Sequence, residues 1–154
     1  MNLMYGTYEC KVDTKGRLAI PVGLKRQFAD CIDDAFVVKR SVFQQCLEIH
    51  TMKNWQKIMD DLGKLNRFVK KNNDFIRVFT AGVKIVELDA NSRMQISKDL
   101  IKFAKIDKEV VLSASVDFVE VWDKELYESI INNVDDVDFA QMAEDIMGKL
   151  NKDE

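Results

Sequence analysis

Two short segments each carry an aspartate followed four positions later by an arginine. In the first, Asp13 precedes Arg17. In the second, Asp89 precedes Arg93. The planar guanidinium group can hold phosphate oxygens or a guanine edge through two parallel hydrogen bonds, so a pair of such arginines suits nucleic-acid binding. The alternatives are an ion pair that only stabilises a turn, and an aspartate that locks the turn while the arginine stays free.

Motifs for catalysis or metal binding are not found. The sequence has neither a P-loop pattern nor a Gly-x-Gly-x-x-Gly fingerprint. Cys10, Cys31 and Cys46 lack Cys-x-x-Cys spacing. On a strand, Cys46 would lie about 13 Å from His50, the single histidine, which is too far to share a zinc ion. We therefore expect no enzyme, no cofactor and no metal site, and interpret His50 as structural.

Charge is divided unevenly along the chain. Residues 1–106 carry 19 Lys and Arg against 12 Asp and Glu, whereas residues 107–154 carry 4 against 14, which gives the net charge of −3. The stretches 11–26 and 64–77 are locally basic. Because the local field decides polyanion binding, this acidic chain can still bind nucleic acid. A solvated basic face is the other explanation for such runs.

The composition indicates a globular protein. Hydrophobic residues make up 47% and charged residues 32% of the 154 positions, which is enough to form a core and too charged for a membrane protein. No apolar run approaches the roughly 20 residues of a membrane helix. Residues 1–10 lack the layout of a secretory signal. With three cysteines, we expect a cytoplasmic protein without a disulfide framework.

The chain contains an internal repeat. Residues 12–18 align with 88–94 at an offset of 76, and both read apolar, Asp, three residues, Arg, apolar. Two further pairs of segments match in order, 36–38 with 110–112 and 47–50 with 119–122. Order, spacing and chemical type are all kept, so two halves share one plan. Two copies are too few for a solenoid, and we predict a pseudo-twofold pair.

Each half is predicted to run strand, turn, strand, short helix, strand, strand, helix. Alternating apolar residues and β-formers predict the strands, and the turn chemistry of residues 13–16 joins the first two. Pro21 and Ser97 are expected at helix starts. The predicted strands are 7–12, 17–20, 35–39, 45–50, 83–88, 93–96, 109–113 and 118–122. The predicted helices are 22–29, 52–65, 67–81, 98–104, 124–131 and one from 135 to about 150. The apolar side chains of Phe75, Val78 and Phe79 either join the core or pack between protomers.

The chain resembles the MraZ family of bacterial transcriptional regulators over nearly its whole length. The resemblance rests on DTKGRLAIP at 13–21, DANSR at 89–93, and the strands at 47–50 and 119–122 followed by Trp55 and Tyr127. It implies an α+β fold of duplicated AbrB-like swapped-hairpin β-barrel units with short helices, related by a pseudo-twofold axis within one chain. We expect a first SpoVT/AbrB-like hairpin unit with its following helix at 1–64, a helical linker at 65–82, a second such unit at 83–134 and an acidic C-terminal helix and tail at 135–154.

The same resemblance implies a sequence-specific DNA-binding transcriptional regulator. It implies a ring-shaped homo-oligomer, associated with the nucleoid, that binds short direct repeats in the promoter of the division and cell-wall gene cluster. Neither a membrane nor a small-molecule substrate is expected as a partner. The alternative is an AbrB-type antidote or interaction module that sequesters a protein partner. Such antidotes usually carry one hairpin unit and a disordered tail, whereas here the unit is duplicated and the C-terminus is predicted to be helical.

The resemblance also assigns roles to individual residues. It implies that DNA is bound by Arg17, Lys15, Arg93 and Lys11. It also implies that the loops are shaped by Asp13, Gly16 and Asp89. The second half departs from the pattern, with Asn91, Ser92 and Ser97 where the first half has Lys15, Gly16 and Pro21. We expect the second loop to be less basic and differently turned, with Asn91 supplying the positive φ of a tight turn.

Overall fold

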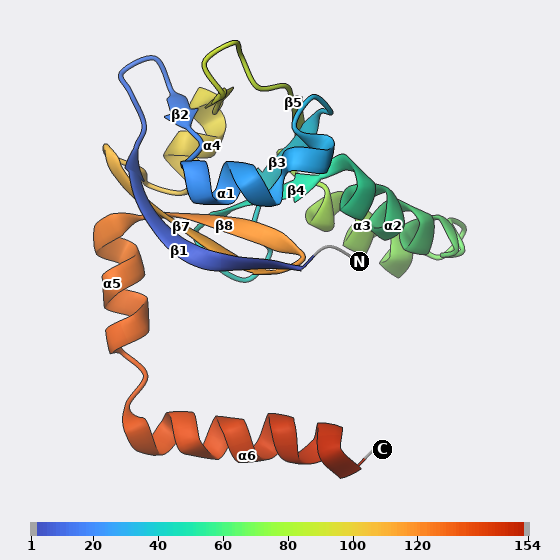
Figure 1. Cartoon of the computed structure of the whole chain (residues 1–154). Coiled ribbons are helices and arrows are strands. Elements are labelled where there is room, and N and C mark those ends of the chain that lie inside the picture. Colours follow the sequence, from blue (N-terminus) through green and yellow to red (C-terminus); the bar gives the residue numbers. More distant parts are fainter. Residues whose placement is uncertain (1–2, 153–154) are drawn as a thin grey trace. The chain divides into compact units, whose positions relative to one another are not determined.

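The computed structural model describes residues 3–152 and divides between Lys124 and Glu125 into two compact units. The first half of the chain contains β1 (Met4–Lys11), β2 (Arg17–Ala19), α1 (Val22–Gln27), the 3-10 helix η1 (Ala29–Cys31), β3 (Phe36–Arg40), β4 (Leu47–Thr51), α2 (Met52–Gly63) and α3 (Lys70–Phe79). The second half contains β5 (Lys84–Val86), β6 (Arg93–Gln95), α4 (Lys98–Phe103), β7 (Glu109–Val116), β8 (Phe118–Asp123), α5 (Lys124–Asn132) and α6 (Asp136–Lys152). Figure 1 shows these elements along the chain.

Every predicted helix and strand is present, with shifted ends. Pro21 and Ser97 precede α1 and α4 as N-caps, and Thr51 caps α2 by accepting a hydrogen bond from the backbone N–H of Asn54. The helix predicted at 67–81 is shorter, because its N-cap is Val69 and its C-cap is Thr80. Strand β5 has three residues where β1 has eight, since β5 pairs over only three positions with β3.

The two halves exchange strands. The six-stranded sheet has the order β1-β7-β8-β4-β3-β5, and β2 pairs with β6 in a separate two-stranded ribbon. Thus β1 from the first half pairs with β7 from the second, and β5 from the second pairs with β3 from the first. These pairings confirm the α+β fold of interleaved hairpins with short helices.

The strand registers repeat between the halves, as a pseudo-twofold axis requires. Cys10 lies opposite Val110 in one outer pair, and Val86 lies opposite Phe36 in the other. The halves meet at pairs of equivalent residues, Leu18 with Met94 in the ribbon and Glu48 with Glu120 in the sheet. The alignment of 36–38 with 110–112 is therefore confirmed by the observed pairing.

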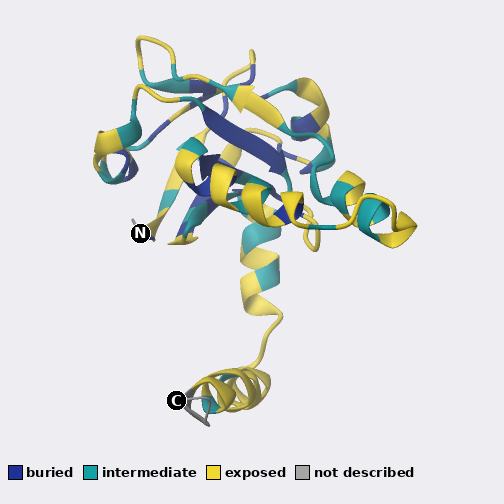
Figure 2. Ribbon diagram, turned by 90° about the vertical axis from the view of Figure 1, so that its right-hand side faces the viewer, coloured by how far each residue is buried: buried dark blue, intermediate teal, exposed yellow. Residues whose placement is uncertain are grey.

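The core lies between one face of the six-stranded sheet and a layer made of the ribbon, α1 and α4. Leu18 and Met94 point inward from the ribbon and are fully buried, as are Leu24 of α1 and Leu100 of α4. Figure 2 shows the buried residues concentrated in the strands of the sheet. Burying a side chain of this size stabilises the fold by roughly 1.5–3 kcal/mol, so the buried face of the ribbon holds its outer face in place.

The second unit contains most of α5 and all of α6. Helix α6 begins with the acidic residues Asp136 and Asp138, which suit the positive end of a helix dipole. Its apolar side chains, including Phe139 and Ile146, are exposed. Within residues 3–152, no helix has both the length and the apolar character needed to span a bilayer.

Candidate nucleic-acid interface

The first hairpin loop, residues 13–16, is organised by the carboxylate of Asp13. One oxygen, Oδ1, accepts hydrogen bonds from the backbone N–H groups of Lys15 and Arg17, each at 2.9 Å. The other oxygen, Oδ2, accepts a hydrogen bond from Nε of Arg17 at 2.7 Å. The N–H of Gly16 donates to the carbonyl of Asp13 at 3.0 Å and closes the turn. One side chain therefore sets both the path of the loop and the direction of the arginine.

The second hairpin loop, residues 89–92, has the same geometry. Oδ1 of Asp89 accepts from the N–H groups of Asn91 and Arg93 at 2.9 Å, and Oδ2 accepts from Nε of Arg93 at 2.9 Å. The expectation of a different turn is wrong, because the residue just before the arginine adopts a positive φ in both loops. That residue is Ser92, with φ 58°, and not Asn91; its counterpart Gly16 has φ 80°.

The loop contacts lower the pKa values of both aspartates. For Asp13 the largest cause is the hydrogen bond from the backbone of Arg17, followed by the Arg17 side chain and the backbone of Lys15, which outweigh a partial loss of solvation. For Asp89 the corresponding groups of Arg93 and Asn91 lower the pKa in the same way. Both carboxylates are therefore ionised at neutral pH and keep their arginines in place.

Each loop is also held by the opposite half of the chain. The N–H of Ile96 donates to the carbonyl of Gly16 at 2.7 Å, and the N–H of Ile20 donates to the carbonyl of Ser92 at 3.1 Å. A Cβ at position 16 would lie 2.7 Å from the Ile96 carbonyl oxygen. Gly16 is thus required by this close approach as well as by its φ. Gln95 adds a hydrogen bond from its side-chain amide to the carbonyl of Lys15 at 2.6 Å.

The ribbon brings the two arginines onto one outward face. Arg17 lies opposite Gln95 and Arg93 lies opposite Ala19, so all four side chains share the face opposite to the buried Leu18 and Met94. The two arginines are diagonal neighbours, whose Cα atoms in such a pair lie about 7–8 Å apart. Their side chains are 32% and 30% exposed. Among the described residues, neither arginine has a hydrogen-bond partner for its two terminal nitrogens.

The remaining candidate cations occupy different places. Lys15 is exposed in the first loop and contributes only backbone groups to the contacts there. Lys11 lies in β1 opposite Glu109, outside the loop. The structure therefore brings together Arg17, Arg93 and Lys15 near the ribbon and places Lys11 in the large sheet. Figure 1 shows both hairpin loops at the same edge of their unit.

Three lysines outside the two Asp-x-x-x-Arg motifs also lie beside the first loop. Lys98, Lys102 and Lys105 line a groove of about 640 Å³ together with Lys15 and Asp13. Lys98 and Lys102 are four residues apart on the short helix α4, and Lys105 follows the end of that helix. This spacing was visible in the sequence. Their position next to a loop some 80 residues earlier depends on the exchange of strands between the halves, so the spacing alone could not place them.

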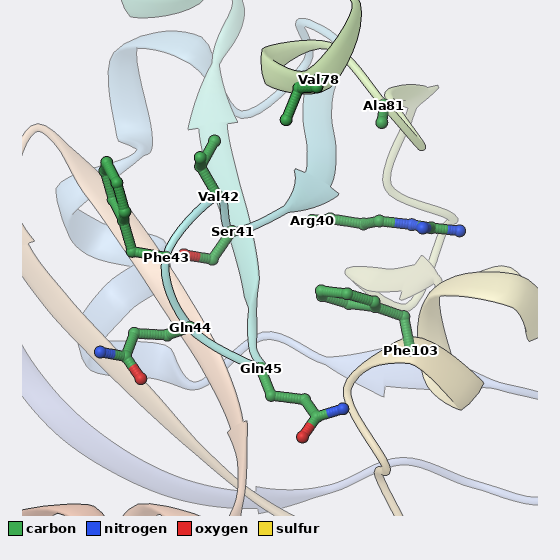
Figure 3. A pocket seen from close by; sticks show the side chains of 9 residues that line it. All are labelled: Arg40, Ser41, Val42, Phe43, Gln44, Gln45, Val78, Ala81 and Phe103. Carbon is green, nitrogen blue, oxygen red and sulfur yellow. The ribbon is translucent and has the colours of Figure 1, made fainter.

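A second hollow lies away from the hairpin loops. It has a volume of about 370 Å³ and is formed by the β3–β4 connection, the end of α3 and Phe103 of α4. Figure 3 shows Arg40 reaching across it near the ring of Phe103, with the guanidinium carbon 4.9 Å from the ring centroid.

Within residues 3–152 no group of His, Cys, Asp and Glu side chains could hold a metal ion.

His50 lies far from both loops in a buried network on the other face of the large sheet. Its Nε2 is 2.9 Å from Oε1 of Glu48, and its ring stacks on Phe118 at 5.1 Å. The equivalent residue, Trp122, donates its indole N–H to Oε1 of Glu120 at 3.3 Å. The single histidine therefore has a packing counterpart in the other half.

Fold and site together define a class of protein in which two interleaved hairpin repeats present a pair of arginines on one ribbon. A model of the family described as "MraZ protein, putative antitoxin-like" matches the chain twice, at residues 3–78 and 79–149. The chain therefore belongs to the MraZ family.

Several relatives support this assignment over most or all of their lengths. A protein from Flavobacterium psychrophilum named "Transcriptional regulator MraZ" is 57% identical over 155 aligned positions, covering 100% of this chain and 98% of the relative. A protein of the same name from Christiangramia forsetii is 56% identical over 145 positions, covering 94% and 93%. Another from Cytophaga hutchinsonii is 33% identical over 153 positions, covering 99% and 100%.

Proposed function

We propose that this protein is a transcriptional regulator that binds double-stranded DNA in a sequence-specific manner through the outward face of the β2–β6 ribbon. The observation that carries the proposal is the matched pair Arg17 and Arg93, held side by side with their terminal nitrogens unpaired within the described chain. The names of the full-length relatives give the same class of function.

The ribbon has the form needed to read a DNA groove. The major groove is about 12 Å wide and admits a two-stranded β-ribbon, and arginine bonds bidentately to O6 and N7 of guanine. The Asp13 and Asp89 carboxylates already hold Nε of each arginine, so little side-chain entropy is lost on binding. Lys15 at the loop tip is placed to contact a phosphate.

Oligomerisation supplies the affinity that one ribbon lacks. A single unit offers few phosphate contacts, so its binding is weak and sensitive to salt. A ring of copies placed on short direct promoter repeats raises the apparent affinity through effective concentration. We place the target in the promoter of the division and cell-wall gene cluster and the protein in the cytoplasm on the nucleoid. Regulation then follows from competition with polymerase, with no chemical step.

A gel-shift assay on the DNA upstream of the protein's own gene tests the proposal, with the native mass measured in parallel. We expect a discrete shifted complex that resists excess unrelated DNA, and a mass of several chains. Equal affinity for upstream and unrelated DNA at the same salt concentration would contradict sequence-specific binding. A single-chain mass at the concentration that binds DNA would contradict the ring.

The antidote alternative is favoured by one observation, the words "antitoxin-like" in the description of the matched family. In this second candidate function, the protein sequesters a small protein partner. The duplicated hairpin and the helical α6 argue for the DNA-binding function instead. Purification from the native host distinguishes them, because an antidote carries a stoichiometric partner and a DNA-binding ring does not.

A further inference from the structure

The groove beside the first hairpin loop is strongly basic. Lys15 lies on the loop side, and Lys98, Lys102 and Lys105 lie on the side of α4. All four side chains are exposed. None of them forms an ion pair with another residue in the part of the chain that the structure describes. Four unpaired cations around one groove give it a positive local field, although the whole chain is acidic.

Nearby acids do not neutralise this groove. Asp13 lies in its lining, but its two oxygens are already occupied by the loop backbone and by Arg17. Asp99 of α4 forms an ion pair with Lys84, in which Nζ of Lys84 lies 3.7 Å from Oδ2 of Asp99. Asp107 is the other carboxylate in the lining. The groove is lined by four lysines and two aspartates, and one of these aspartates, Asp13, is already paired with Arg17. The groove therefore carries a net positive charge.

The fold fixes the side of α4 that carries the lysines. Leu100 and Ala104 are buried in the core. Lys98 and Lys102 are four residues apart and share the opposite face. Lys105 follows the helix with φ 54°. Lys102 and Lys105 also suit the negative end of a helix dipole, but that effect does not explain Lys98 in the first turn.

The equivalent surface in the other half is chemically different. At the offset of 76, Lys98, Lys102 and Lys105 correspond to Val22, Arg26 and Ala29. Lys25, at the position of Ile101, adds one further cation, while Asn91 replaces Lys15. The two loops share the same backbone geometry, but the charged side chains beside them differ.

We propose that Lys98, Lys102 and Lys105, with Lys15, bind the DNA phosphate backbone on one side of the ribbon only, so that each chain holds the duplex in one orientation. The inference rests on the proposed DNA-binding function. Proteins with true twofold symmetry match palindromic sites. A chain with unequal halves matches an oriented site, and copies of it placed side by side match sites repeated in the same direction. The groove adjoins the arginine ribbon through the first loop, so one duplex reaches both.

The salt dependence of DNA binding tests the phosphate contacts. The triple variant Lys98→Gln/Lys102→Gln/Lys105→Gln is compared with wild type on one upstream duplex over a range of KCl concentrations. Each phosphate contact contributes about 0.9 to the slope of log affinity against log salt, so the slope should become shallower by about 2–3. The preference for the specific site over unrelated DNA should stay within about twofold, because phosphate contacts carry no sequence information.

A matched variant controls for the loss of three charges. Lys53→Gln/Lys57→Gln/Lys64→Gln removes three exposed lysines at or next to α2 and should leave the slope nearly unchanged. Thermal denaturation of both variants checks that they are folded. The inference is overturned if the α4 variant keeps the wild-type slope or changes it no more than the α2 variant does. If wild type shows no preference for upstream DNA, the proposed function fails as well.

The orientation is tested by phosphate ethylation interference on a single repeat. Wild type should show interference extending further on one side of the repeat centre, and the α4 triple variant should lose that extension. An interference pattern symmetric about the repeat centre in wild type would overturn the proposal that each chain binds the duplex in one orientation, even if specific binding itself is confirmed.

Discussion

At the scale of single residues, each hairpin depends on an aspartate whose two carboxylate oxygens accept hydrogen bonds from different groups. Oδ1 of Asp13 holds two backbone N–H groups, and Oδ2 holds Nε of Arg17. The sequence left open whether the aspartate pairs with the arginine or locks the turn. The structure shows that it does both, and that within residues 3–152 only Nε of the arginine side chain is hydrogen-bonded. Substituting the arginine therefore leaves the loop backbone bonded.

Gly16 should be the position in the first loop that is most sensitive to substitution. Gly16→Ala places a Cβ against the Ile96 carbonyl and forces a left-handed φ on alanine. We expect a loss on the order of 2 kcal/mol in the free energy of unfolding. Ser92→Gly relieves the left-handed serine in the second loop and should be neutral or slightly stabilising. Chemical denaturation measures both, and equal destabilisation by the two changes would contradict this account of the loops.

Acid should loosen both loops. The folded-state pKa of Asp13 and of Asp89 lies below its ordinary value. For such a group the stabilisation is fully present above the unfolded pKa of about 3.9 and is lost as the pH falls through the lower folded value. Carboxyl NMR titration should show both aspartates titrating below the ordinary aspartate value of about 3.9. A titration of Asp13 at or above 3.9 would contradict the hydrogen-bonding scheme.

At the scale of elements, local patterns were sufficient to predict the strands and helices but not their partners. Alternation and turn residues located β1 and β2, and the repeat showed that Leu18 and Met94 are equivalent. Only the resemblance implied that the hairpin units of the two halves are swapped. The α4 lysines were missed for the same reason, because their distance from the first loop is set by long-range pairing and not by local sequence.

The packing of α3 on the sheet involves a buried lysine. Nζ of Lys39 lies 3.5 Å from Oε1 of Glu48 and 4.6 Å from the centroid of the Phe79 ring. Burial lowers the pKa of Lys39, and the nearby Glu48 carboxylate partly offsets this effect. The lysine therefore joins β3 to both β4 and α3.

Removing this lysine should destabilise the fold. Lys39→Ala leaves the Glu48 carboxylate without its cation and opens a gap beneath Phe79, so we expect a loss of about 3 kcal/mol in the free energy of unfolding. The exposed Lys53→Ala serves as the control and should change stability by less than about 0.5 kcal/mol. Urea denaturation compares the two, and similar values would contradict a structural role for Lys39.

At the scale of the whole molecule, several large apolar side chains are exposed. Phe43 and Phe68 are 91% and 100% exposed, and Val78 is 62% exposed beside the hollow in Figure 3. Contiguous exposed apolar patches mark interaction surfaces, and Phe43 and Val78 line the same hollow. Of the three apolar residues of α3 whose role was left open, Phe79 stacks on Trp55 with ring centroids 6.1 Å apart. Phe75 and Val78 are 52% and 62% exposed and do not join the core. Their packing between protomers stays a prediction.

Self-association should depend on these aromatic residues. We expect Phe43→Ser combined with Phe68→Ser to lower the native mass or to raise the concentration needed for assembly by at least tenfold. The fold of each chain should be unaffected, because neither ring is buried within it. Analytical ultracentrifugation over a concentration series measures this, and an unchanged distribution of masses would remove both residues from the interface.

The most direct test of DNA binding by the ribbon is the affinity of Arg17→Ala for the upstream DNA at fixed salt, with Lys57→Ala as a charge-matched control. Losing one bidentate base contact costs about 1–3 kcal/mol per chain. Repeated over several copies, this loss should reduce the variant's affinity to that for unrelated DNA. Melting temperature and native mass should stay at wild-type values, since Asp13 still holds the loop backbone. Wild-type affinity and specificity in a folded, assembled Arg17→Ala protein would contradict the account.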